Sequence, residues 1–223
     1  MDFKIISIGA LSRHDIWGET DPVRTAHATT ILVRSQDRTI LVDPGLPPQI
    51  ITARLAERSG LTPQDITDVF LTSFRPPHRW GLGSFDHANW LISDRERQST
   101  GHFLITRLEK ETDADARRLM EQDVALLQRC RPAPDRLALQ VDLFPLPGFT
   151  AGTCGLLLSH VNCTTLVAGD AVGTQEHLAE GRILPGAYDA EEARTSLTEA
   201  IEIADVIIPG HDNLVLNPTR QPM

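Results

Sequence analysis

Four side chains capable of chemistry recur in the same order in the two halves of the sequence. In the first half, one apolar run ends at Asp43 and a later one is followed by His78. In the second half, corresponding runs end at Asp170 and His211. Neutral imidazole and carboxylate groups suit zinc, iron or manganese as ligands. The pattern therefore predicts a metal site wherever these side chains meet.

The order of elements around the four residues indicates how they meet. Each half has a strand, an acid, a helix, a second strand and a histidine. Ligand sites in α/β folds form beyond the carboxyl ends of strands, so face-to-face packing of the halves would bring the four side chains into one cleft. Gly169 and Gly210 directly precede Asp170 and His211. A glycine at such a place lets the backbone approach an ion or a substrate closely.

Short β-branched runs and a few helical stretches indicate the α/β class. The predicted strands cover residues 3–8, 29–34, 39–42, 66–72, 90–93, 139–144, 155–160, 164–168 and 206–208. A helix is expected after the proline pair at 47–48 and ends before Gly60. Apolar residues at helical spacing predict a second helix over 113–130, and acidic residues at the start favour a third over 190–204.

Composition limits the classes of partner. The chain has 223 residues, of which 41% are hydrophobic, so one domain over residues 1–223 with a sizeable core is expected. With 21 Lys and Arg against 30 Asp and Glu, the net charge of −9 disfavours nucleic acid and anionic membranes as partners. No stretch has the roughly 18 apolar residues of a membrane helix. Small molecules are the expected partners.

Two further features of the composition concern location and source. The three cysteines are odd in number and lack C-x-x-C spacing, which predicts neither a disulfide framework nor a thiolate zinc site and fits a reducing cytoplasm. Arginine outnumbers lysine by 19 to 2, which favours a GC-rich bacterial source.

Five segments together resemble the metallo-β-lactamase superfamily over about residues 29–211. They are TILVDPG at 39–45, LTSFRPPHRWG at 71–81, PLPGFTAG at 145–152, VAGD at 167–170 and IIPGH at 207–211. The resemblance implies a four-layer αββα sandwich of two related halves with its cleft at one edge. It also implies hydrolysis through a hydroxide activated by a metal ion.

The metal signature of that superfamily, T-H-x-H-x-D-H-x-G-G, is mostly replaced in this chain. Of its ligands only the last histidine is present, as His78. Ser73, Arg75 and Phe149 stand where the resemblance implies three of the four ligands of one ion. Pro77 replaces one ligand of the other ion. The resemblance therefore implies at most one Zn or Fe ion, held by the residues that remain in ligand positions, His78, Asp170 and His211.

Arg75 carries a fixed positive charge and cannot ligate a metal ion. In one interpretation it reaches the place of the missing ion and forms a salt bridge to Asp170 or Asp43. In the other it points away into solution. Phe149 and Trp80 are interpreted as apolar filling of the altered site. His14, His27 and His87 are candidate replacement ligands or ordinary loop histidines, and no G-x-S-x-G motif supports Ser73 as a nucleophile.

Two functions follow from this pattern. The first is a mononuclear metallohydrolase or related lyase, in which His78, Asp170 and His211 hold the ion, and Arg75 and Asp170 act as catalytic residues, with Arg75 orienting an anionic substrate. The second is a catalytically silent protein whose metal-free cleft binds a small anion or a partner chain. Metal content separates the two.

Overall fold

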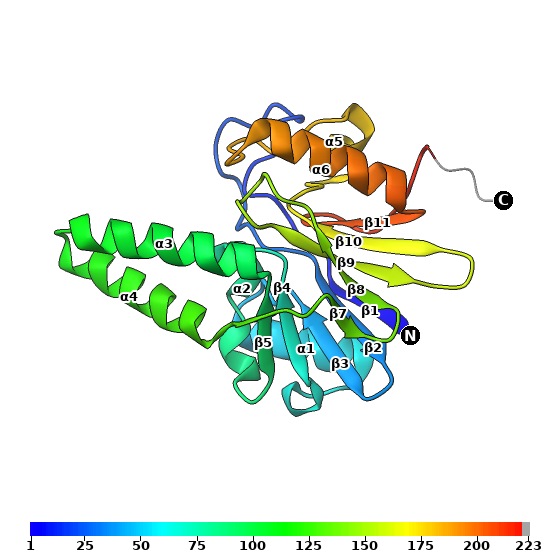
Figure 1. Ribbon diagram of the computed structural model, residues 1–223, viewed down its shortest axis with the longest axis horizontal. Coiled ribbons are helices and arrows are strands. Elements are labelled where there is room, and N and C mark those ends of the chain that lie inside the picture. Colours follow the sequence, from blue (N-terminus) through cyan, green and yellow to red (C-terminus); the bar gives the residue numbers. More distant parts are fainter. Residues whose placement is uncertain (220–223) are drawn as a thin grey trace.

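The computed structural model describes residues 1–219 and contains two six-stranded sheets (Figure 1). The first sheet has the strand order β1 (Asp2–Ser7), β2 (Thr30–Ser35), β3 (Arg38–Val42), β4 (Asp68–Leu71), β5 (Asn89–Ile92) and β6 (Arg131–Pro132). The second has the order β12 (Val215–Leu216), β11 (Val206–Pro209), β10 (Thr164–Gly169), β9 (Cys154–Ser159), β8 (Val141–Pro145) and β7 (Arg136–Ala138). The domain expected over residues 1–223 includes 220–223, which lie outside the described residues, so its extent stays a prediction.

Alternating side chains give each sheet two buried faces. In β2, Ile31 and Val33 lie in the core between the two sheets, whereas Leu32 lies in the core on the outer face of the first sheet. In β10, Val167 belongs to the core between the sheets and Leu166 to the outer core of the second sheet. Successive side chains of a strand point to opposite faces, which explains the split. Both sheets are therefore internal layers.

Helices cover the two outer faces. They are α1 (Pro48–Ser59), α2 (Pro76–Arg79), α3 (Asp94–Lys110), α4 (Ala114–Arg129), α5 (Gln175–Glu180) and α6 (Ala190–Ile203). Helix α1 packs Ile51 and Leu55 against the first sheet, and α6 packs Leu197 and Ala200 against the second. The order of layers is thus helix, sheet, sheet, helix, which confirms the predicted four-layer α/β sandwich.

The ends of the predicted helices follow their capping signals. Helix α1 begins after Pro47 and ends at Gly60, whose φ of 74° places it in the left-handed region that favours glycine. Helix α6 begins after Asp189, whose carboxylate accepts hydrogen bonds from the first backbone N–H groups of the helix. Among residues 1–219 there is no helix with the length and apolar character needed to cross a lipid bilayer.

Helix α3 was not predicted from the sequence. It forms an antiparallel hairpin with α4, and the hairpin extends away from the sheets (Figure 1). In α3 only Glu96 and Leu104 are buried, so the helix has no clear apolar stripe. Gly101, near its centre, also has a low helix propensity. The strand expected over 139–144 begins only at Val141, because Gln140, with φ of 64°, forms the turn between β7 and β8.

The parallel strand pairs set the position of the site. Strands β3 and β4 run parallel, and so do β10 and β11. Within each pair the carboxyl ends therefore lie side by side, and Asp43 and Asp170 directly follow β3 and the end of β10. Both pairs end at the same edge of the sandwich, where the interactions described below join them.

Candidate metal site

Asp43 is held rigidly at the end of β3. Its backbone has a φ of 48°, which is unfavourable for a residue other than glycine. The carboxylate compensates by accepting hydrogen bonds from the backbone N–H and the hydroxyl of Thr72, at 2.9 and 2.6 Å. The same carboxylate lies 3.0 Å from Nδ1 of His78. Asp43 therefore orients the His78 ring from the side away from Asp170.

Asp170 reaches the site because two glycines allow the strand ends to come together. A Cβ atom on Gly169 would lie 2.6 Å from the hydroxyl oxygen of Thr72, and Gly169 has a φ of 54°. A Cβ atom on Gly210 would lie 2.8 Å from the backbone of Gly169. Both glycines thus allow the backbone to pack closely, as the sequence indicated. The atoms that they approach belong to the protein, however, and not to an ion or a substrate.

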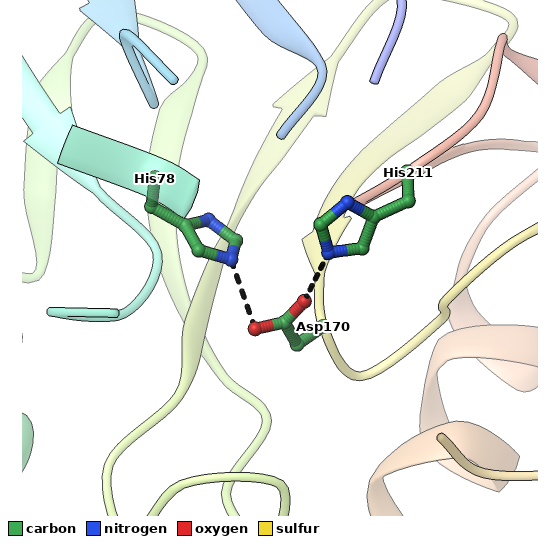
Figure 2. Close-up of side chains that lie close together, drawn as sticks. All are labelled: His78, Asp170 and His211. Atoms are coloured by element: carbon green, nitrogen blue, oxygen red, sulfur yellow. Dashed lines mark hydrogen bonds and ion pairs between the residues drawn. The ribbon is translucent and has the colours of Figure 1, made fainter. Parts of the chain in front are cut away.

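His78, Asp170 and His211 form the centre of the site (Figure 2). Nε2 of His78 lies 2.9 Å from Oδ2 of Asp170, and Nε2 of His211 lies 2.9 Å from Oδ1. All three residues are buried. They come from α2 and from the ends of β10 and β11, so the two halves of the chain converge as predicted.

Arg75 occupies a third position around the Asp170 carboxylate. Its Nη1 lies 3.0 Å from Oδ2, the same oxygen that faces His78. The guanidinium carbon lies 4.6 Å from the centre of the Phe149 ring, and Phe149 is buried. The salt-bridge interpretation of Arg75 is confirmed, with Asp170 and not Asp43 as the partner. Phe149 is buried beside Arg75, in agreement with its interpretation as apolar filling, but Trp80 is 52% exposed, so the same interpretation of Trp80 was wrong.

The buried charges determine the proton state of the metal-free site. Burial lowers the pKa of His78, but the carboxylates of Asp170 and Asp43 outweigh this effect and raise it from 6.5 to about 10. Burial raises the pKa of Asp170, but the charge of His78 and the hydrogen bonds from both histidines outweigh it and hold the pKa well below the usual range. Without an ion, His78 is therefore an imidazolium between two carboxylates.

We expect the stability of the metal-free protein to fall as the pH rises from about 6.5 to about 10. The native state holds the His78 proton with a pKa of about 10, whereas the unfolded chain releases it near 6.5. The stabilisation is thus complete below pH 6.5 and is lost as the pH approaches 10. Urea midpoints measured with EDTA across this range test the prediction. The His78→Gln variant should show a flatter profile, and identical slopes for both proteins would contradict it.

The other candidate histidines lie outside the site. His27 is half-buried and its ring faces the carbonyl oxygens of Thr25 and Ile8, although the His27 carbonyl accepts a hydrogen bond from Nδ1 of His211 at 3.0 Å. The ring of His87 faces the carbonyl of Ile66. His14 stacks on Trp17 and lies near Thr174. None of the three belongs to the His78–Asp170–His211 group, which is the group of potential ligands found among residues 1–219.

Glu96 is an organising residue that sequence reasoning missed. Its buried carboxylate accepts hydrogen bonds from the backbone N–H of Phe74 at 3.0 Å, the hydroxyl of Thr150 at 2.7 Å and the backbone N–H of Gly152 at 3.1 Å. These contacts join the segment that carries Arg75 to the segment that carries Phe149. The only available signal was an acidic residue in the first turn of α3, a helix that was not predicted.

The site fits a divalent ion by its donor set and by the orientation of the rings. Ligand atoms of His78, Asp170 and His211 all lie within 4.8 Å of one another. Nδ1 of each ring faces an oxygen outside this group, the Asp43 carboxylate or the His27 carbonyl. Such contacts fix the rings of metal-binding histidines, with Nε2 directed at the ion. Binding of an ion would require the loss of the protons on Nε2.

A small cavity gives access to the site. Its volume is about 210 Å³, and it reaches His211 and Arg75. Arg13, Asp15 and Phe149 also line it. A small molecule in this cavity would contact the Arg75 guanidinium directly.

The match to a family model places this geometry in a known class of proteins. The model of the metallo-β-lactamase superfamily matches residues 24–211. The chain belongs to this superfamily, as the motifs and the four-layer fold predicted.

Solved structures with the same fold include several enzymes, all of low sequence identity. A protein from Thermotoga maritima described as a putative metallo-β-lactamase is 16% identical, with a TM-score of 0.70 and 96% of this chain and 98% of that chain covered. The dizinc quorum-quenching lactonase AidC is 17% identical, with a TM-score of 0.69 and coverage of 87% and 76%. AiiA of B. thuringiensis is also 17% identical, with a TM-score of 0.65 and coverage of 94% and 92%. No curated protein matches the sequence.

Proposed function

We propose that this chain is a metallohydrolase of the superfamily with a reduced centre that holds at most one divalent ion on His78, Asp170 and His211. The observation that supports it is the ion pair between Arg75 and Asp170, with Nη1 at 3.0 Å from Oδ2. The guanidinium takes one side of the carboxylate that bridges two ions in dinuclear relatives. A second cation beside it would meet a fixed positive charge.

Each residue around the centre has a separate task in this proposal. Asp43 and Thr72 hold the ring of His78, and the His27 carbonyl holds the ring of His211. When bound, the ion lowers the pKa of a coordinated water and polarises a carbonyl group. Arg75 supplies the second positive charge and orients an anionic substrate from the cavity beside it.

One observation favours a metal-free alternative. In the structure, Asp170 already accepts hydrogen bonds from His78, His211 and Arg75, so the buried carboxylate is satisfied by protein donors alone. In this alternative the protein is catalytically silent, and its cleft binds a small anion or a partner chain. The protons on the two Nε2 atoms then replace the ion.

Metal analysis of protein dialysed against Zn²⁺ should give no more than one ion per chain. His211→Ala should abolish binding, because it leaves two protein ligands where catalytic zinc sites have three. His87→Ala is the matched control, since the exposed His87 lies outside the site, and it should bind as the unmodified protein does. Inductively coupled plasma spectrometry with and without prior EDTA treatment measures the content.

The outcomes of this experiment separate the proposals. A content near zero favours the metal-free alternative, and two ions per chain would show that Arg75 does not exclude the second ion. Metal retained by the His211→Ala variant would place the site elsewhere. The hydrolase proposal also requires that ester or lactone hydrolysis by the loaded protein is lost with EDTA and in that variant.

Zinc or iron is the proposed ion, because two imidazoles and one carboxylate suit both. A cytoplasmic location is proposed because Cys130, Cys154 and Cys163 are all free thiols. A bacterial source rests on the excess of arginine. The net charge of −9 supports a small molecule rather than nucleic acid or an anionic membrane as the partner.

A further inference from the structure

A larger groove lies next to the cavity beside the site and shares lining residues with it. The groove has a volume of about 640 Å³ and follows the α3–α4 hairpin. Arg75, Phe149 and Pro185 line both spaces, so these residues form a shared wall. A ligand can therefore lie with one end at Arg75 and the rest of its length along the hairpin.

The cavity end of this cleft favours a negative charge. The Arg75 side chain is 40% exposed and uses only Nη1 for Asp170, which leaves its other N–H groups for a ligand. Arg13 lines the cavity and forms no ion pair with any residue between 1 and 219. The carboxylate of Asp15 is already paired with Arg182 and His177, at 2.8 and 3.0 Å.

The groove end favours an apolar chain. Its walls include Phe74, Phe103, Leu104, Met120 and Phe149. Its two acidic residues are already engaged, since Glu96 accepts three hydrogen bonds from protein groups and Asp123 pairs with Arg79 at 2.8 Å. Phe103 is 57% exposed on the groove, and the guanidinium of Arg107, which also lines the groove, lies 5.9 Å from the centre of its ring.

We propose that the cleft binds an organic monocarboxylate, with its carboxylate on Arg75 and its alkyl chain along the α3–α4 groove. Guanidinium binds carboxylate through paired N–H groups, and the apolar walls remove the chain from water. The role of this ligand as substrate or product rests on the proposed function. Its binding uses Arg75 and the groove, and does not need the metal ion.

Calorimetric titration in EDTA with acetate, octanoate and 1-octanol tests the proposal. Octanoate should bind about tenfold or more tightly than acetate, because burial of two or more methylene groups suffices for that ratio. It should also bind more tightly than octanol, which lacks the charge. Equal affinities for octanoate and acetate would show that the groove does not bind the alkyl chain. Equal affinities for octanoate and octanol would show that Arg75 does not bind the carboxylate.

Variants test each end of the ligand separately. Arg75→Gln should weaken octanoate about tenfold, whereas Arg54→Gln, which removes a similarly exposed and paired arginine of α1, should not. Arg75→Lys keeps the charge and should retain part of the affinity if the Gln variant fails to fold. Phe103→Ser, at an exposed position, should weaken octanoate several-fold and leave acetate unchanged. Octanoate binding that is unaffected by both the Arg75 and Phe103 changes would overturn the proposal.

The two proposals fail in different ways. A protein that binds no metal but binds octanoate through Arg75 supports the proposed carboxylate binding and contradicts the proposed metal centre. A protein that binds one ion but shows no preference for octanoate refutes the cleft and leaves the metal centre intact.

Discussion

Asp170→Asn should lower the free energy of unfolding of the metal-free protein by about 3–5 kcal/mol, the range for removing one partner of a buried ion pair. The carboxylate is buried and accepts hydrogen bonds from His78, His211 and Arg75. The amide keeps one acceptor oxygen and turns the other position into a donor that faces N–H groups. The imidazolium of His78 also loses one of its two carboxylates.

Urea denaturation at pH 7 in EDTA measures this change. Asp37→Asn is the control, because Asp37 is exposed in the turn between β2 and β3, where loss of a charge should change the stability little. A loss below about 1 kcal/mol for Asp170→Asn would show that the site is hydrated and that its charges contribute little to folding.

The strands and the repeat were predictable because their signals are local. A short apolar, β-branched run such as Ile31, Leu32 and Val33 indicates a buried strand from neighbouring residues alone. Acids and histidines just past apolar strands then had to lie at strand ends, and parallel pairing brings such ends together. This logic correctly united Asp43, His78, Asp170 and His211 at one edge.

The contacts inside the site depended on tertiary structure. The sequence left Arg75 with two candidate carboxylates and a solvent-facing alternative. The structure places its Nη1 at Asp170 and its guanidinium over the Phe149 ring, and both contacts join segments far apart in the sequence. Glu96 escaped notice because α3 buries only two side chains, so its periodic pattern is too weak to mark a helix. Trp80 shows the opposite error, since an aromatic residue within a motif need not be buried.

Arg75→Ala should destabilise the metal-free protein by about 1–2 kcal/mol, less than the loss of Asp170. The reason is that the arginine side chain is 40% exposed, so water screens its charge, and Asp170 keeps both histidines. Thermal unfolding in EDTA measures the effect, with Arg54→Ala as the control for an exposed arginine that pairs with a neighbour on its own helix. A midpoint equal to that of the unmodified protein would show that Arg75 does not act as a substitute cation.

Arg75→His tests whether position 75 faces the proposed metal ion. This variant removes the guanidinium and places an imidazole where the superfamily signature has a ligand, so it should be destabilised in EDTA and recover in Zn²⁺. Binding to the native state alone adds about 2.7 kcal/mol when the free ion is at a hundred times its dissociation constant. Arg75→Ala has no new ligand and should gain from Zn²⁺ no more than the unmodified protein does. If the two variants respond equally to Zn²⁺, position 75 does not face the ion, and the guanidinium cannot be what limits the centre to one metal.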